Sequence, residues 1–162
     1  MAKKKEEKTN VMRALEQKKI PYQAHTYPAD GGAVDGVSVA AYLGQDPAAV
    51  FKTLVTRGTS GAYYVFDIPV AENLDLKKAA KAVGEKSIAM IAQKELLPLT
   101  GYVHGGCSPV GMKKLFPTVF HQTADELESI MVSAGKIGFQ VQCRPADLLN
   151  LVGGKTADII VD

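Results

Sequence analysis

The pattern of apolar and polar positions predicts a mixture of short helices and short strands. Helical periodicity with a capping residue before it or a glycine after it indicates helices, and alternating or β-branched apolar runs indicate strands. Helices are predicted at residues 10–18, 38–43, 47–50, 74–83 and 144–151. Strands are predicted at residues 20–27, 51–57, 62–70, 87–91, 118–122, 129–135, 139–143 and 157–162.

The order of these segments predicts one domain. The apolar runs at 51–57 and 62–70 are joined by the turn sequence GTSG, which indicates a hairpin. Gly31 and Gly32 are expected to end the extended segment before them as a loop. Since neither a repeat nor a linker interrupts the pattern, we predict an α+β fold with a single domain at residues 9–162, preceded by a charged tail at residues 1–8.

Composition narrows the classes of protein. The chain has 162 residues, of which 46% are hydrophobic and 22% charged, as expected for one buried core. It contains no run of about 18 apolar residues and no apolar signal segment, so we expect no membrane association and a cytoplasmic location. The net charge of +2 is small for a protein that holds nucleic acid by charge alone. We expect no DNA partner, and weak RNA binding unless a partner protein assists.

The most chemically distinctive stretch is HGGCSPVGMKK, from His104 to Lys114. A Walker phosphate loop needs a first glycine, then four residues, then Gly-Lys-Ser/Thr. Gly106 and Gly111 have the first spacing, but Met112 stands where the lysine belongs. The sequence VGGKTAD near the C-terminus lacks the first glycine and leaves too few residues for the following helix. Neither stretch therefore predicts a phosphate loop.

A serine or cysteine nucleophile is the next alternative for this stretch. The Gly-x-Ser-x-Gly elbow fails because Val110 replaces its last glycine and Pro109 removes the backbone donor after Ser108. Cys107 would need a histidine base. The candidate bases are His25, His104 and His121. Because buried, unreactive cysteines are more common, we favour a packing role for Cys107 and expect both it and Cys143 to be reduced thiols.

The remaining chemistry of the stretch is that of its backbone. Consecutive glycines such as Gly105 and Gly106 allow main-chain N–H groups to converge on an oxyanion or a phosphate. A tight turn without any ligand is the alternative, and the residues alone leave both open.

Four motifs together resemble a known family. VFKTLV (50–55), LDLKKAAKAVG (74–84), TGYVHGGCSPVG (100–111) and VSAGKIG (132–138) occur in this order and at these distances. They resemble the bacterial YbaK family of single-domain Cys-tRNA(Pro) deacylases, which are related to the editing domain of many prolyl-tRNA synthetases. The resemblance extends from Thr9 to the end of the chain and includes IPYQAHTY.

The resemblance implies a central mixed β-sheet surrounded by helices, with a pocket for the aminoacylated 3′ end of tRNA. Lys52 matches the family's essential lysine, whose implied role is to hold the terminal phosphate or ribose. Gly105 and Gly106 match the loop that binds the ester carbonyl. The other implied substrate-binding residues are Tyr27, Thr53, Ser108, Pro109 and Ser133. We expect neither cofactor nor metal, and prolyl-tRNA synthetase is a candidate partner.

The family's implied mechanism is trans-editing in which the substrate's own thiol attacks the ester and leaves as a cyclic thioester that water opens. The protein then supplies position and a backbone oxyanion site. Two departures bear on specificity: Ile137 and Gln140 replace a charged pair, and Cys107 replaces an aliphatic residue. Editing of tRNA charged with alanine or serine is therefore one alternative. A module that binds aminoacyl-tRNA or a nucleotide without turnover, and a structural partner of a synthetase, are the others.

Overall fold

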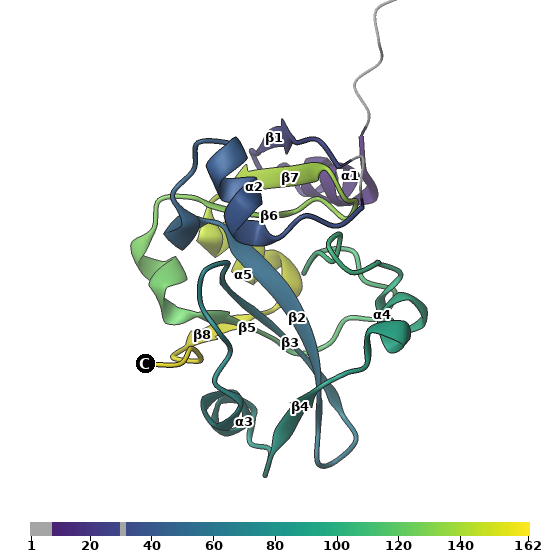
Figure 1. Cartoon of the computed structure of the whole chain (residues 1–162), viewed down its shortest axis with the longest axis vertical. Coiled ribbons are helices and arrows are strands. Elements are labelled where there is room, and N and C mark those ends of the chain that lie inside the picture. Colours follow the sequence, from purple (N-terminus) through teal and green to yellow (C-terminus); the bar gives the residue numbers. More distant parts are fainter. Residues whose placement is uncertain (1–7, 30–31) are drawn as a thin grey trace, which may run out of the picture.

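Two β-sheets form the framework of the molecule, which the computed structural model describes for residues 8–29 and 32–162. The first sheet is antiparallel, with strand order β1–β7–β6, and the second is mixed, with strand order β4–β2–β3–β5–β8. The strands are β1 (Gln23–Thr26), β2 (Phe51–Gly58), β3 (Tyr63–Pro69), β4 (Ile88–Met90), β5 (Thr118–His121), β6 (Ile130–Ser133), β7 (Phe139–Cys143) and β8 (Lys155–Ala157). A parallel bridge between Val50 and Met131 joins the sheets, which lie one above the other in Figure 1.

Short helices connect these strands. They are α1 (Asn10–Gln17), α2 (Gly36–Tyr42), α3 (Leu76–Val83), α4 (Gln93–Thr100) and α5 (Pro145–Val152), with 3₁₀ turns η1 (Pro47–Ala49) and η2 (Gln122–Glu126). Thr9 and Asp75 cap α1 and α3 by accepting hydrogen bonds from backbone N–H groups of the first turn. Gly84 and Gly153 end α3 and α5 in the left-handed conformation that glycine adopts without strain. Within the described residues, no helix has the length and apolar character needed to span a membrane.

Helix α2 covers the junction of the two sheets, as Figure 1 shows. Ala40 of α2 packs with Val50, Val70 and Met131 in a small buried cluster beside the bridge. At Gly36, the first residue of α2, a Cβ atom would lie 2.3 Å from Cγ1 of Val70. Glycine therefore allows the helix to start directly against the end of β3, and this brings α2 beside the start of β2.

The predicted α+β fold is confirmed, and most predicted segments contain an observed element. The expected central sheet is divided into two sheets, and the predicted hairpin is β2 and β3 in antiparallel register. Residues 47–49 form a 3₁₀ turn and not an α-helix. Helix α4 was not predicted, and it contains Pro98, a residue that usually ends helical patterns. The predicted tail and Gly31 lie outside the described residues, except for Lys8.

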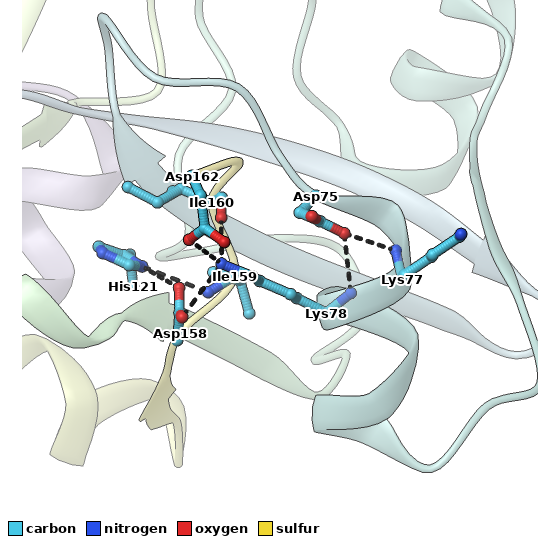
Figure 2. Close-up of polar contacts among 8 residues, drawn as sticks. All are labelled: Asp75, Lys77, Lys78, His121, Asp158, Ile159, Ile160 and Asp162. Atoms are coloured by element: carbon cyan, nitrogen blue, oxygen red, sulfur yellow. Dashed lines mark hydrogen bonds and ion pairs between the residues drawn. The ribbon is translucent and has the colours of Figure 1, made fainter.

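The predicted last strand at residues 157–162 is wrong. Strand β8 ends at Ala157, and the chain beyond it runs to α3, where Figure 2 shows its contacts. Nζ of Lys78 donates to the Ile160 carbonyl at 2.9 Å and to the carboxylates of Asp158 and Asp162 at 3.1 and 2.7 Å. The Lys78 side chain and the backbone of Asn73 and Asp75 thus satisfy backbone groups of residues 159–161, and a local alternation of apolar residues cannot reveal these distant partners.

Candidate active site

The predicted site residues gather around a cavity of about 380 Å³ between α2, the start of β2 and the loop that follows α4. Those that line its wall are Tyr27, Lys52, Thr53, Gly105 and Ser133. The wall also contains Asp35, Val39, Phe51, His104, Cys107 and Gln140, for which no substrate-binding role was predicted. Residues from four separate motifs of the sequence therefore meet at one place.

A second, more open hollow lies between the start of β1 and α5. Its volume is about 740 Å³, and its walls include Tyr22, Glu128, Gln142 and Arg144. It contains none of the predicted site residues. Because it is the larger of the two, size alone does not identify the active site, and the chemical groups in the smaller cavity decide the assignment.

Lys52 supplies a half-buried cation to the cavity wall. Burial lowers the pKa of its ammonium group, and the negative charge of Glu72 opposes that shift. Among the described residues no carboxylate forms an ion pair with Lys52. An ammonium group that is not neutralised within the protein is suited to a phosphate or ribose oxygen of a ligand.

The glycine loop contributes Gly105 to the wall, while Gly106 lies behind it. Gly105 has a φ of +88°, and a Cβ atom there would lie 2.6 Å from the Cβ of Ala33, so the site requires glycine. Gly106 N–H donates to the Val103 carbonyl at 3.0 Å and is used within the turn. For Gly105 N–H, by contrast, no acceptor is found in the described part of the chain. Of the two, the Gly105 N–H is therefore the one available to a ligand.

Ser108 and Pro109 are buried beneath the loop and do not line the cavity. The Ser108 hydroxyl accepts a hydrogen bond from Val110 N–H at 3.3 Å, which stabilises the turn. Both residues therefore shape the loop in this structure, and a direct contact with substrate stays a prediction for them.

Cys107 lines the cavity as a thiol and has no activating surroundings. Burial and then the nearby Asp67 raise its pKa to about 12, the opposite of what an activated cysteine needs. Of the three candidate bases, only His104 lines the same cavity. His25 hydrogen-bonds to Gln142 at 2.9 Å, and His121 accepts from Ile159 N–H at 3.3 Å (Figure 2). This geometry favours the packing role for Cys107.

The first sheet supplies the polar wall opposite β2. Ser133 of β6 and Gln140 of β7 are direct cross-strand neighbours, and both are 7% exposed. The Ser133 hydroxyl accepts from Gly135 N–H at 3.1 Å, whereas Oε1 of Gln140 has no hydrogen-bond partner in the described structure. A buried acceptor without a donor is costly, so Gln140 is placed to receive a hydrogen bond from a ligand.

Asp67 lies behind the wall and was missed by the sequence analysis. It is fully buried on β3, directly opposite Thr53 of β2, and Thr53 Oγ1 lies 2.5 Å from Asp67 Oδ1. Burial raises its pKa to about 8, and the hydrogen bond from Thr53 opposes that shift. The available signal was an acidic residue inside the apolar run VFDIPV, where a charge is rarely found.

Comparisons with known proteins assign the chain that forms this cavity to a family. Residues 32–151 match the family model of the aminoacyl-tRNA editing domain, a region that includes every cavity residue named above except Tyr27. The chain is 46% identical over 160 residues, 98% of each chain, to a protein of Enterococcus faecalis assigned as the Cys-tRNA(Pro)/Cys-tRNA(Cys) deacylase EbsC.

Solved structures agree with this match. A protein assigned as a trans-editing enzyme for prolyl tRNA synthetase superposes with a TM-score of 0.82 at 26% identity, covering 94% of this chain and 95% of that one. The hypothetical protein APE2540 shares the fold, with a TM-score of 0.83 at 20% identity over 93% of this chain and 99% of its own. On the strength of the family model and the 46% identical relative, this chain belongs to the aminoacyl-tRNA editing domain family.

Proposed function

We propose that this protein is a trans-editing deacylase that hydrolyses the ester bond of Cys-tRNA(Pro), and also of Cys-tRNA(Cys). The observation that carries the proposal is the cavity in which Lys52, Thr53, Gly105 and Ser133 meet within a chain of the editing family. The E. faecalis relative, with its assigned activity on both substrates, supports the choice of amino acid. We place the reaction in the cytoplasm, where aminoacyl-tRNAs are used.

The cavity groups have distinct roles in this proposal. The Lys52 ammonium binds the terminal phosphate or ribose, and the backbone N–H of Gly105 donates to the ester carbonyl oxygen as negative charge develops on it. Neither group reacts covalently. Each holds the ester in place, and the oxyanion donor lowers the barrier by about 3–4 kcal/mol where its alignment is good.

The nucleophile in this proposal is the substrate's own sulfur. The thiol attacks the ester carbonyl carbon, the bond from carbon to the ribose 3′ oxygen breaks, and the thiol proton passes to that oxygen. The products are a free 3′-hydroxyl on the tRNA and a cyclic thioester, which water opens to cysteine. This route is supported by Cys107, the thiol in the wall, whose pKa is raised to about 12 and which is therefore a poor nucleophile near neutral pH.

Single-turnover assays test the function. The protein is incubated with tRNA(Pro) charged with cysteine, alanine, serine or proline, and with Cys-tRNA(Cys). The control variant is Lys77→Ala, whose substitution lies on the exposed face of α3. Faster ester loss from the cysteinyl substrates than from the others supports the proposal. Preference for alanine or serine would establish a different editing specificity. Tight binding without ester loss would show that the chain is a binding module.

A second assay tests whose thiol reacts. Cys-tRNA(Pro) with a methylated sulfur differs from the substrate by one methyl group and has no thiol to attack the ester. We expect its rate to fall to the uncatalysed level and a trapped cyclic thioester to appear only with the free thiol. Equal rates on both substrates would contradict the mechanism and point to an activated water.

The tRNA is bound with low intrinsic affinity in this proposal, because the net charge is only +2. Prolyl-tRNA synthetase is the partner that would deliver the mischarged tRNA before it diffuses away. Adding the synthetase should raise the apparent affinity for Cys-tRNA(Pro) and leave Cys-tRNA(Cys) unaffected. An equal effect on both would contradict a specific partnership.

A further inference from the structure

We propose, resting on the proposed function, that Asp67 acts as a neutral carboxylic acid that orients Thr53, so that the Thr53 hydroxyl donates its hydrogen into the cavity and binds an oxygen of the aminoacyl ester. Asp67 is then a positioning residue, since it reaches the substrate only through Thr53.

The register of β2 and β3 sets this pair. Thr53 and Asp67 are direct partners across the antiparallel ladder, and their side-chain oxygens lie 2.5 Å apart. β3 is flanked on its other side by β5, where Phe120 is the partner of Asp67. Asp67 therefore lies on a central strand, and its carboxyl group is fully buried, whereas Thr53 is part of the cavity wall.

The surroundings of Asp67 disfavour a negative charge. Its Oδ2 has no hydrogen-bond partner in the described structure, and no ion pair there involves Asp67. The elements packed around it carry further titratable groups: Lys52 and Arg57 on β2, Tyr63 and Tyr64 on β3 itself, His121 on β5, and Tyr102, His104, Cys107, Lys113 and Lys114 on the loop after α4. Of these, Cys107 responds to the charge of Asp67, through a raised thiol pKa. A desolvated carboxylate with one hydrogen bond is costly, and burial accordingly raises the Asp67 pKa to about 8.

The position of the carboxyl proton follows from hydrogen-bond satisfaction. A proton on Oδ2 would have no acceptor, whereas a proton on Oδ1 points at Thr53 Oγ1, 2.5 Å away. An unsatisfied buried hydroxyl is more costly than an unsatisfied carbonyl oxygen with no hydrogen to place. The carboxylic acid therefore donates to Thr53, and the Thr53 hydroxyl hydrogen is left to point into the cavity.

Ionisation of Asp67 reverses this arrangement. A carboxylate only accepts hydrogen bonds, so Thr53 must then donate to Oδ1 and loses its donor toward the cavity. The group on the wall changes from donor to acceptor while the heavy atoms stay in place. Substrate ester oxygens accept hydrogen bonds, so the protonated form is the active one.

The test compares single-turnover rates of the wild-type protein and Asp67→Asn from pH 6 to pH 9. An asparagine amide donates to Thr53 at every pH, as the neutral acid does. Uncatalysed hydrolysis is subtracted, and ionisation of the substrate thiol cancels in the ratio of the two rates. The ratio of the wild-type rate to the variant rate should fall about tenfold between pH 6 and pH 9, as expected for one group with a pKa of about 8. A ratio that does not change with pH would overturn the proposal.

Variants of β2 separate orientation from packing. Thr53→Val removes the hydroxyl and should slow turnover at least tenfold, Thr53→Ser should restore it, and the ratio of Thr53→Val to Thr53→Val/Asp67→Asn should not vary with pH. Thr56→Val is the matched control, because its buried hydroxyl donates to the Tyr64 carbonyl at 3.0 Å and lies outside the cavity. Full activity in Thr53→Val would contradict the proposed donor.

An infrared measurement is independent of turnover. The difference spectrum of wild type minus Asp67→Asn should contain the carbonyl band of a protonated carboxyl at pH 6, shifted by Thr53→Val and absent at pH 10. Absence of this band at pH 6 overturns the proposal even if the protein is an active deacylase. If the band is present and no charged tRNA is hydrolysed, the proposed deacylase function is wrong, and the assignment of Thr53 as an ester ligand is wrong as well.

Discussion

Lys52 on β2 and Asp67 on β3 are the two ionisable residues of the apolar hairpin that concern the site. Their surroundings differ in burial and in hydrogen bonding. The Lys52 side chain reaches the cavity and keeps partial access to solvent. Asp67 is fully buried with one hydrogen bond, so its charge is suppressed. The hairpin thus offers the ligand a cation at one position and a neutral hydrogen-bonding pair at the next.

Lys52→Ala should reduce single-turnover deacylation on the order of 10²-fold, because loss of the contact with the terminal phosphate or ribose misplaces the ester relative to the oxyanion donor. The fold should persist, because Lys52 is half-buried and the substitution opens no closed cavity in the core. Circular dichroism and thermal unfolding check the fold, and Lys77→Ala is the control. Near-normal turnover in a folded Lys52→Ala protein would remove Lys52 from the site.

Gly105→Ala should lose most of the deacylation activity, whereas Cys107→Ala should keep it. Gly105→Ala places a methyl group 2.6 Å from the Ala33 Cβ at a φ of +88°, so the loop must shift and the backbone donor moves with it. Cys107→Ala removes only a buried sulfur, and most of the activity should remain. Turnover numbers of both purified variants decide between them. Loss of activity in Cys107→Ala alone would favour a cysteine nucleophile.

Asp67→Asn should stabilise the protein increasingly with pH. Folding raises the pKa of Asp67 from 3.8 to about 8. The contribution of this group to the stability of the wild type is therefore fully present below pH 3.8 and is lost as the pH rises through the folded-state pKa. Asparagine has no such loss. The difference in unfolding free energy between variant and wild type should grow by about 4 kcal/mol from pH 5 to pH 8. Urea unfolding at both values measures it, and a constant difference would show that Asp67 is ionised throughout.

At the scale of elements, the segment after β8 depends on α3 for its place. Lys78 connects α3 to the last residues of the chain by three hydrogen bonds. Two of these are ion pairs. The hydrogen bond to Asp162, then that to Asp158, and the negative charges of both raise the pKa of Lys78. The neighbouring Lys77 is exposed and uses its backbone N–H, not its side chain, in the Asp75 cap. Of these two adjacent lysines, only Lys78 therefore holds the end of the chain through its side chain.

Lys78→Met should lower the melting temperature more than Lys77→Met, and amide exchange at residues 158–162 should become faster only in the first variant. High salt should reduce the difference, since screening weakens the two ion pairs. Both variants should retain deacylation, because neither lysine lines the active cavity. Identical melting temperatures at low salt would show that the contacts in Figure 2 do not hold the segment in solution.

For the whole molecule, the small net charge limits how tRNA is held. With a charge of +2, few phosphates are neutralised and few counterions are released on binding. Binding should therefore depend mainly on the cavity and the 3′ end. This differs from proteins that hold nucleic acid through an extended basic surface.

The logarithm of tRNA affinity plotted against the logarithm of salt concentration should have a slope of about −1 to −3, corresponding to few phosphate contacts. A short aminoacylated 3′ fragment should retain most of the affinity of full-length tRNA. Equilibrium binding at several salt concentrations, with uncharged tRNA as the control, measures both. A slope steeper than about −6 would indicate an extended basic interface that the net charge conceals.

The sequence by itself determined the α+β class, the hairpin of β2 and β3 and the positions of most strands, because these follow from local periodicity and turn residues. Its motifs also indicated the editing family and Lys52. Local pattern could not predict α4, which contains Pro98, or the end of the chain, whose partner is Lys78 on a distant helix.

Only the tertiary structure decided which side chains share the cavity and in what state. Thr53 and Asp67 are 14 positions apart and meet because of strand register, while Ser133 and Gln140 reach the same cavity from the other sheet. Burial then raises the pKa of Asp67 and leaves Oε1 of Gln140 without a donor among the described residues. Burial and hydrogen-bond partners depend on every element that packs around a group, so they arise only when the chain has folded.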